Sequence, residues 1–514
     1  MDARAKLSVP YEVLLMIAAF ADRKSLLTLL ATCRSLHSDC AKYVLQDPVQ
    51  LCGDRDIISF ILFMRPHDCK RWRHLRSLRF FGERIDSLVA KGLAKAIRRA
   101  SHLESLVFNH AERTLGAHPD LPLAFAAIRT VKHLVIDYGY QHTCRMLEAM
   151  HWPLESVVLN RTDFRSGWRD PDHLDRMHPA ALLKNSCATL KTLECESWCE
   201  CSSTLDTYPV YPELESLYLE AVWCPRAAQW AVSYPALKRL SVSTIDSHFM
   251  EVDEDYLAAH SANRLLNLHE FTALPQKWNE LEQFDGDTLD LYLLGLPCHV
   301  QDVTLTLSPD SLQFFAPVMT TARPTRLRLS INTHLFNQPV PTYLQDPGLA
   351  DLKSLELRVV SWVGDTDVDD GGDPDVDRFL RHALDTLQRA SAREFVFYLT
   401  IGTSGTRATL DALSPEPDDP IEQGRPATAT RRPATPAPVV EAPPISAVEA
   451  WATTADLDAL VLRFLDEVPS LESVKLSVQP WSPSSLMNSR SAESSRARNL
   501  SVEAKDVPLV VSEA

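Results

Sequence analysis

The sequence lacks the features that mark several large classes of protein. Its formal net charge is -16 and its isoelectric point is near 5.5, so a broad basic surface for nucleic-acid phosphates is not expected. No run of 18 or more apolar residues occurs, and the segment before residue 7 is too short and too charged to open a secretory signal. We expect a protein of the cytoplasm or nucleus that binds neither nucleic acid nor membrane.

Metal-binding patterns are also missing. The eleven cysteines are odd in number and contain no Cys-x-x-Cys pair, so reduced thiols are expected. An EF-hand loop beginning at Asp365 would need Gly at Asp370 and Glu at Val376, so the acidic run there is expected to be a solvated loop. The nearest approach to a zinc site is a group of five residues, Cys187, Cys195, Cys199, Cys201 and Cys224, of which Cys195 occupies an inward position of an expected strand.

Enzyme motifs are absent as well. No P-loop, His-Glu-x-x-His or dinucleotide-binding glycine motif occurs, and the Gly-Thr-Ser-Gly at 402–405 lacks the spacing of a nucleophile elbow. Two pairs, Cys33 with His37 and His142 with Cys144, could be drawn as nucleophile and base, but both lie on expected helices among apolar neighbours. We expect no catalytic residues and no cofactor.

Residues 7–45 contain short amphipathic helices around a charged turn at 22–24. Pro10 suits a first helical turn, and Ser25 is the expected N-cap of the second helix. Apolar residues recur at helical spacing on both sides of the turn: Val13, Leu14, Ile17 and Phe20, then Leu26, Leu29 and Leu30. A module of about 40 residues is too small to bury all of them, so the apolar surplus must meet the next domain or a partner.

These residues resemble the F-box family, particularly its fungal members. The family's Leu-Pro-x-Glu opening, its Ile, its acidic-Leu pair and its Thr-Cys-Arg-x-Leu close are met by Pro10, Glu12, Ile17, Leu26 and the segment 32–36, with departures at Val9, Ala21 and Ser25. The resemblance implies docking to a Skp-type adaptor and, through it, to a cullin. The implied adaptor-binding residues are Val9, Pro10, Glu12, Leu14, Ile17, Leu26, Leu29, Cys33 and Leu36. Alternatively, the helices only cap a repeat array.

The rest of the chain carries a recurring pattern of apolar residues at i, i+3 and i+5. Its copies are HLRSLRF (74–80), HLESLVF (102–108), TVKHLVI (130–136), PLESVVL (153–159), TLKTLEC (189–195), ELESLYL (213–219), ALKRLSV (236–242), HVQDVTL (299–305), PTRLRLS (324–330), DLKSLEL (351–357) and SLESVKL (470–476). The first four copies stand 23 to 28 residues apart, and helical patterns such as 86–100 and 376–390 lie between copies. Each unit therefore reads as strand, turn and helix.

This pattern resembles the leucine-rich-repeat family, although the family's usual turn Asn is missing. The resemblance implies an α/β solenoid over 46–481 with a parallel sheet on its concave face, following the all-α module. No single repeat can offset the entropy of ordering its own backbone, so the copies must stack. The Pro, Ala and Thr-rich segment 403–449 is an expected disordered insertion, and the Ser-rich 482–514 an expected disordered tail.

The expected function is that of a non-enzymatic substrate receptor in a cullin-based (SCF-type) ubiquitin ligase. The module would hold the adaptor and the repeats would hold an unknown protein target. The outward strand positions are the candidate target contacts, with Tyr218 as the favoured anchor because aromatic residues dominate interface hot spots: Arg79, Glu194, Tyr218, Arg239, Arg328, Glu356 and Lys475. Their charge alternates in sign, which is more often typical of a solvated face than of a recognition surface. The alternative function is a leucine-rich-repeat interaction scaffold without a ubiquitin role.

Overall fold

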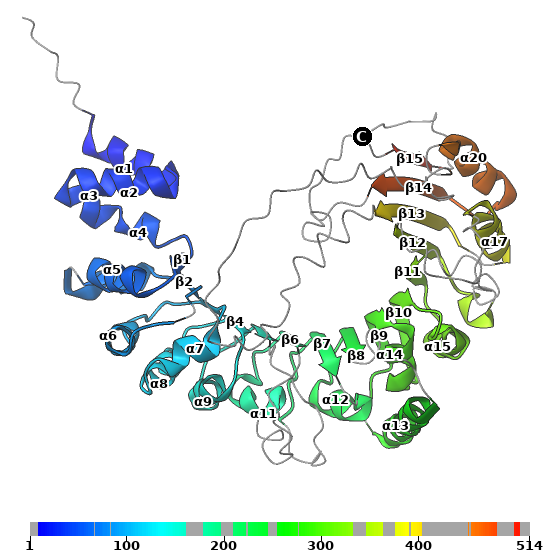
Figure 1. Ribbon diagram of the computed structural model, residues 1–514, viewed down its shortest axis with the longest axis horizontal. Helices are drawn as coiled ribbons and strands as arrows, with labels where there is room; N and C mark the ends of the chain where they lie inside the picture. Colours follow the sequence, from blue (N-terminus) through cyan, green and yellow to red (C-terminus); the bar gives the residue numbers. More distant parts are fainter. Residues whose placement is uncertain are drawn as a thin grey trace, which may run out of the picture. The chain divides into compact units, whose positions relative to one another are not determined.

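A computed structural model gives the fold of the chain (Figure 1). It describes residues 9–65, 67–82, 84–160, 178–196, 209–222, 225–244, 254–275, 277–332, 346–362, 376–389, 392–402, 451, 454–480 and 498–503. The chain divides into two compact units. Unit 1 is Met1–Leu281 with Leu293–Leu296, and unit 2 is Glu282–Tyr292 with Pro297–Ala514. Both units contain parallel strands joined through helices, which confirms the expected α/β class.

Unit 1 opens with four short helices: α1 (Tyr11–Phe20), α2 (Arg23–Thr32), α3 (Arg34–Asp39) and α4 (Ala41–Val44). The expectation that Ser25 caps the second helix is wrong. Asp22 is the N-cap, and its carboxylate accepts from the Ser25 backbone N–H at 2.8 Å and from the Ser25 hydroxyl at 3.0 Å. Ser25 occupies the third helical position, whose N–H is the one that a capping side chain satisfies. Asp22 therefore fixes where α2 begins.

The remainder of unit 1 is a parallel sheet whose strands follow chain order. Its strands are β1 (Val49–Leu51), β2 (Ser77–Phe80), β3 (Ser105–Phe108), β4 (His133–Asp137), β5 (Ser156–Asn160), β6 (Thr192–Glu196), β7 (Ser216–Val222) and β8 (Arg239–Thr244). Its helices are α5 (Asp54–Met64), η1 (His67–His74), α6 (Ser87–Ile97), α7 (Ala111–Gly116), α8 (Leu121–Ala126), α9 (Gln141–Ala149), α11 (Pro179–Leu182), η2 (Lys184–Ser186), α12 (Ala227–Ser233) and α13 (Glu254–Ala273). Figure 1 shows these helices along one face of the strands.

The i, i+3 and i+5 positions explain why these segments form strands. In the repeat that contains β3 they are Leu103, just before the strand, and Leu106 and Phe108 within it, all fully buried. The register places Phe108 beside Phe80 of β2, and the two rings stack with centroids 5.1 Å apart. Neighbouring repeats are also joined just before each strand, where the Lys132 N–H donates to the Glu104 carbonyl at 2.8 Å. The core is therefore continuous from repeat to repeat, as a stacked array requires.

Unit 2 has the same construction with longer strands. Strands β10 (His299–Leu307), β11 (Arg326–Asn332), β12 (Ser354–Trp362), β13 (Glu394–Gly402) and β14 (Ser473–Pro480) pair in parallel, and β15 (Arg498–Glu503) pairs antiparallel with β14. Its helices are η5 (Leu312–Phe314), α15 (Phe315–Ala322), η7 (Pro347–Leu349), α17 (Val376–Arg389) and α20 (Leu457–Glu467). The division between the units falls within β9 (Glu280–Asp287) and α14 (Thr288–Leu294).

All eleven copies of the repeat pattern contribute to strands, so that prediction is confirmed. Strands β1, β9, β13 and β15 were not predicted. The expectation of a disordered tail over 482–514 is wrong for Arg498–Glu503, because this segment forms β15. The remainder of that tail and the expected insertion 403–449 lie outside the described residues. Among the helices that the structure describes, none is long and apolar enough to cross a bilayer.

Candidate functional site: the exposed face of the N-terminal helices

Helices α1 to α4 share a small core of their own. Its buried members come from all four helices and their links: Ala18, Leu26, Leu30, Leu36, Cys40 and Val44. Tyr11, Leu14, Leu15 and Leu29 pack against this cluster and are partly buried. The Tyr11 hydroxyl donates to Asp39 at 2.7 Å, which ties α1 to α3, and this bond raises the pKa of Tyr11 to about 12. The four helices are thus held together without using all of their apolar side chains.

Arg71 joins these helices to the repeats. Its side chain is 4% exposed and donates to the Phe63 carbonyl at 2.6 Å and to the His37 carbonyl at 2.8 Å. The guanidinium also lies over the Phe63 ring, 4.4 Å from its centroid. Burial lowers the pKa of Arg71. Because this joint uses α3 and the end of α5, it leaves α1 uncovered.

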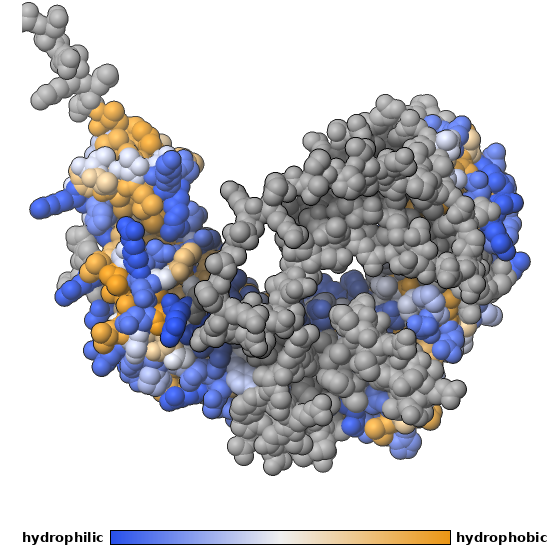
Figure 2. Space-filling model, in the orientation of Figure 1, coloured by the Kyte–Doolittle hydropathy of each residue, from blue (hydrophilic) through white to orange (hydrophobic). Residues whose placement is uncertain are grey.

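One face of α1 is apolar and exposed. Val13, Met16, Ile17 and Phe20 follow the i, i+3, i+4, i+7 spacing of a single helical face. Their exposed fractions are 41%, 63%, 49% and 89%. Val9 before the helix and Leu27 of α2 are also exposed, and Figure 2 shows apolar side chains gathered on the N-terminal helices. We call Val9, Val13, Met16, Ile17, Phe20 and Leu27 the α1 face.

The α1 face overlaps only partly with the predicted adaptor-binding residues. Of these, Val9, Pro10, Glu12, Ile17 and Cys33 are exposed, and Leu14 and Leu29 are partly buried. Leu26 and Leu36 are 3% and 2% exposed, so they support the helices from the core, and their contact with an adaptor stays a prediction. Val13, Met16, Phe20 and Leu27 belong to the α1 face but not to the predicted set, although the helical spacing of Val13 and Phe20 was visible in the sequence.

The sheet of unit 1 has a second candidate surface. On strands β2 to β8, side chains that alternate with the buried ones are partly exposed, and we call these positions the open face of unit 1. The register aligns Asp137, Asn160, Glu196 and Glu220 across four strands. Burial raises the pKa of Asp137, while the Asn160 amide, which donates at 2.8 Å, opposes the rise.

The last two members of this row, Glu196 and Glu220, are both carboxylates. Burial raises the pKa of Glu196, with Glu220 and Asp137 adding to the rise through like charge. Tyr218 is 39% exposed and its hydroxyl donates to Glu220 at 2.7 Å. Of the predicted target contacts, the register places Glu194 beside Tyr218, while Arg239 and Arg79 lie on β8 and β2, apart from this pair. The structure therefore brings two of these four residues together.

The open face of unit 2 is an ion-pair network. Arg328 forms ion pairs with Asp302 at 3.1 Å and with Glu356 at 3.4 Å, and Glu356 also pairs with Arg358 at 2.6 Å. Lys475 lies over the Tyr398 ring, 5.5 Å from its centroid. The predicted residues Arg328 and Glu356 are thus in contact, and the strand β13 separates Glu356 from Lys475.

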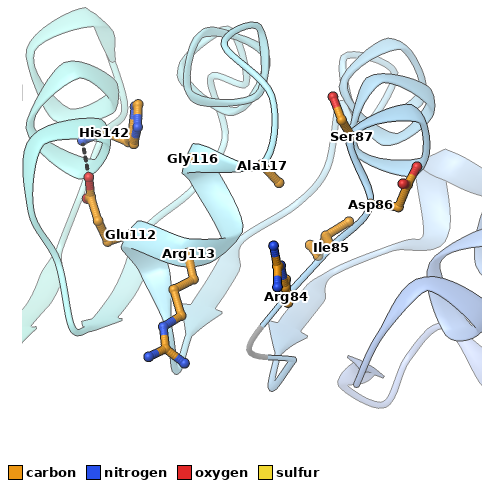
Figure 3. Close-up of a pocket in the computed structure, with 9 residues that line it drawn as sticks. All are labelled: Arg84, Ile85, Asp86, Ser87, Glu112, Arg113, Gly116, Ala117 and His142. Carbon is orange, nitrogen blue, oxygen red and sulfur yellow. Dashed lines mark hydrogen bonds between the residues drawn. The ribbon is translucent and has the colours of Figure 1, made fainter. Parts of the chain in front are cut away.

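The structure describes all four residues of the two candidate catalytic pairs. His142 and Cys144 lie two residues apart on α9, so their side chains point in different directions. His142 lines a cavity of about 930 Å³, where the Glu112 carboxylate accepts from its backbone N–H at 2.8 Å (Figure 3), whereas Cys144 is buried. Cys33 lies between α2 and α3, and His37 contacts Arg71 and Phe63.

The structure describes only Cys187 and Cys195 of the five cysteines that came nearest to a zinc-site pattern. Cys195 is 2% exposed, at the inward position that the sequence predicts, while Cys199, Cys201 and Cys224 lie outside the described residues, as does the acidic run before Val376. In the part of the chain that the structure describes, no group of three or more His, Cys, Asp or Glu side chains is arranged to hold a metal ion.

Comparison with known families finds no model that matches the chain, and comparison with curated proteins finds no match either.

Proposed function

We propose that this protein is the substrate-recognition subunit of a cullin-based ubiquitin ligase. Helices α1 to α4 act as an F-box that docks to a Skp-type adaptor, and the strands and helices that follow act as leucine-rich repeats that bind the protein to be ubiquitinated. The protein itself supplies no catalytic group in this proposal. Its contribution is to hold the target near the catalytic arm of the ligase, so the acceleration comes from proximity.

The α1 face is the observation that carries the proposal. Five apolar side chains from Val9 to Phe20 are 41% exposed or more, in a module whose core is complete without them. Soluble monomers seldom expose a contiguous apolar patch unless it serves an interaction. The same residues lie where the sequence resembles the F-box, and Pro10, Glu12 and Ile17 of that resemblance are all exposed.

The open faces of units 1 and 2 supply the proposed target contacts. Parallel strands in chain order present long rows of side chains in register, which suits recognition of an extended protein surface. Aromatic and Arg side chains are the usual interface anchors, and Tyr218 in unit 1 and Arg328 in unit 2 occupy such rows. The acidic row from Asp137 to Glu220 further favours a target with basic side chains.

The experiment is co-purification of the full chain from extract, followed by detection of adaptor and cullin. The intact chain should recover both, and the double variant Met16→Asp with Phe20→Asp should recover neither. The matched control is Leu123→Asp with Val232→Asp, which places the same two charges on exposed apolar residues of α8 and α12 and should behave as the intact chain. Failure of the intact chain to recover adaptor and cullin would overturn the ligase assignment.

The second candidate function is a repeat scaffold that binds a partner without a ubiquitin role. The mixed ion-pair network on the open face of unit 2 is compatible with either function. The co-purification experiment separates them, because a scaffold would recover a partner that depends on Tyr218 or Arg328 but would be indifferent to charges on the α1 face.

A further inference from the structure

A groove lies between α5 and α6, on the helical side of unit 1. Its hollow has a volume of about 230 Å³ and is lined by Ile61 and Arg65 of α5, Trp72 of η1, and Gly92, Lys95, Ala96 and Arg99 from α6 and the turn after it. Trp72 and Ala96 form a buried floor, with exposed fractions of 3% and 9%. The groove lies outside both the α1 face and the open faces of the sheets.

Gly92 is unexplained by the protein's own packing. It lies in the interior of α6, where glycine is among the least favourable residues for a helix. A Cβ at Gly92 would meet only the Ile61 Cδ1 atom, at an ordinary 3.8 Å. At Gly348, by contrast, a Cβ would clash with the backbone of Met319, so the fold itself requires that glycine. An interior helical glycine with free space above it fits the close approach of another molecule.

The ionisable residues that the structure describes in the lining of this groove are all basic. They are Arg65, Lys95 and Arg99, although the whole chain carries a net charge of -16. Exposed apolar side chains lie on the same two helices: Ile58 and Leu62 on α5, and Leu88, which is 78% exposed, on α6. The groove therefore combines an apolar hollow with a basic rim.

We propose that this groove binds an acidic peptide segment of a partner protein. An apolar side chain of the segment enters the hollow above Gly92 and contacts Ile61 and Trp72. Asp or Glu residues on either side of it face Arg65, Lys95 and Arg99, and the charge of the rim selects an acidic segment over a basic one. The inference does not depend on the ligase assignment, because no residue of the α1 face takes part.

The probe is a labelled ten-residue peptide in which Leu and Phe alternate with Asp and Glu, measured by fluorescence anisotropy with the full-length protein. A peptide with Lys in place of every acidic residue is the charge control. We expect the acidic peptide to bind and the basic peptide to bind at least tenfold more weakly. Equal binding of the two peptides, or no binding of the acidic one, would overturn the proposal.

Two variants locate the site. Gly92→Leu fills the hollow while improving the helix propensity of α6, so it should weaken the acidic peptide at least tenfold and raise the thermal unfolding midpoint. Loss of binding then cannot be attributed to misfolding. Lys95→Glu should weaken binding to a similar extent, and Arg145→Glu, the same charge reversal on an exposed position of α9, should not. Unchanged binding by Gly92→Leu would contradict the assignment.

Two further measurements exclude other occupants. Phe20→Asp should bind the acidic peptide as the intact chain does, because its α1 face is not involved; weakened binding there would move the site to α1. Sedimentation should show a monomer for both the intact chain and Gly92→Leu. A dimer that is lost in Gly92→Leu would show that the groove receives a second copy of this chain instead of a partner's segment.

Discussion

The N-terminal helices and the repeats of unit 1 use apolar residues at similarly regular spacing and place them in opposite surroundings. In the repeat of β3 the patterned residues Leu103, Leu106 and Phe108 are fully buried between neighbouring repeats. In α1 the patterned residues Met16 and Phe20 are 63% and 89% exposed. A repeat has a neighbour on each side that covers its apolar face, whereas the residues that the structure describes cover α1 on one side only.

This difference teaches that a regular apolar pattern predicts which face of a helix or strand is apolar. The pattern does not predict whether the same chain or another protein covers that face. Where the chain supplies the cover, the pattern marks a core. Where the chain supplies none, the same pattern marks a surface available to another protein. Four measurements would break or sharpen this comparison.

The largest difference is expected between two identical substitutions. Phe108→Ala removes a ring that packs against Phe80 and Phe125, and should lower the free energy of unfolding by about 3 to 5 kcal/mol. Phe20→Ala removes a ring that is 89% exposed, and should change it by less than about 0.5 kcal/mol. Urea denaturation of the two variants measures both. Similar losses in the two variants would show that the α1 face is covered within the protein.

A pH-dependent loss of stability is expected in the repeats. His178 is 4% exposed, and burial lowers its pKa from 6.5 to about 4. Its folded pKa is below its unfolded pKa, so its neutral form stabilises the fold above pH 6.5, and this contribution is lost as the pH falls towards 4. The loss is about 3 kcal/mol by linkage.

The comparison for His178 is His178→Asn across the same pH range. Asn retains a side-chain acceptor for the Ala180 N–H, which Nδ1 of His178 accepts at 3.1 Å, and cannot be protonated. Denaturation midpoints of the wild type should fall relative to those of His178→Asn below pH 6.5. Parallel curves for the two proteins would show that His178 does not control this part of the pH dependence.

A substitution at Arg71, which joins the N-terminal helices to the repeats, should lower the free energy of unfolding by an intermediate amount. Arg71→Met keeps much of the apolar stem and removes the charged hydrogen bonds to the Phe63 and His37 carbonyls, at a cost of about 2 kcal/mol. Hydrogen exchange should accelerate in α3 and remain unchanged in β3. Faster exchange spread evenly over both elements would mean that the helices and the repeats unfold as one unit.

The smallest effect is expected on the open face of unit 2. Glu356→Gln keeps the side-chain size and removes the charge that pairs with Arg328 and Arg358. The expected loss of stability is within about 1 kcal/mol, and it should shrink as salt is added because the pairs are partly exposed. Denaturation at low and high ionic strength measures it. A larger, salt-independent loss would place Glu356 among the core residues.

The repeat strands could be predicted because nearly every copy carries three apolar positions in a fixed spacing, the copy at 324–330 having Pro324 at the first of them. The signal of the missed strands is weaker. β1 is only three residues long, β13 has only the small Ala392 at the i position before Phe395 and Phe397, and β15 lies in a Ser-rich segment whose Leu500 and Val502 are too few to stand out. Their pairing comes from the neighbouring strand, which offers an unpaired backbone edge that the sequence does not show.

The candidate site was only partly predictable for a related reason. Resemblance to a family located the module and several exposed residues, including Pro10 and Ile17. It could not separate Leu26, which is buried in the module core, from Met16, which is exposed on α1. The two side chains have similar hydropathy, and their burial depends on how the helices cross.

The sequence by itself determined the α/β class, the positions of eleven strands and the amphipathic helices at the start of the chain, because local spacing of apolar residues dictates which face of each element avoids water. Only the tertiary structure decided that α1 turns its apolar face outwards, that Gly92 opens a groove between α5 and α6, and that Arg328 meets Asp302 and Glu356. These features depend on contacts between residues far apart along the chain, which no local pattern specifies.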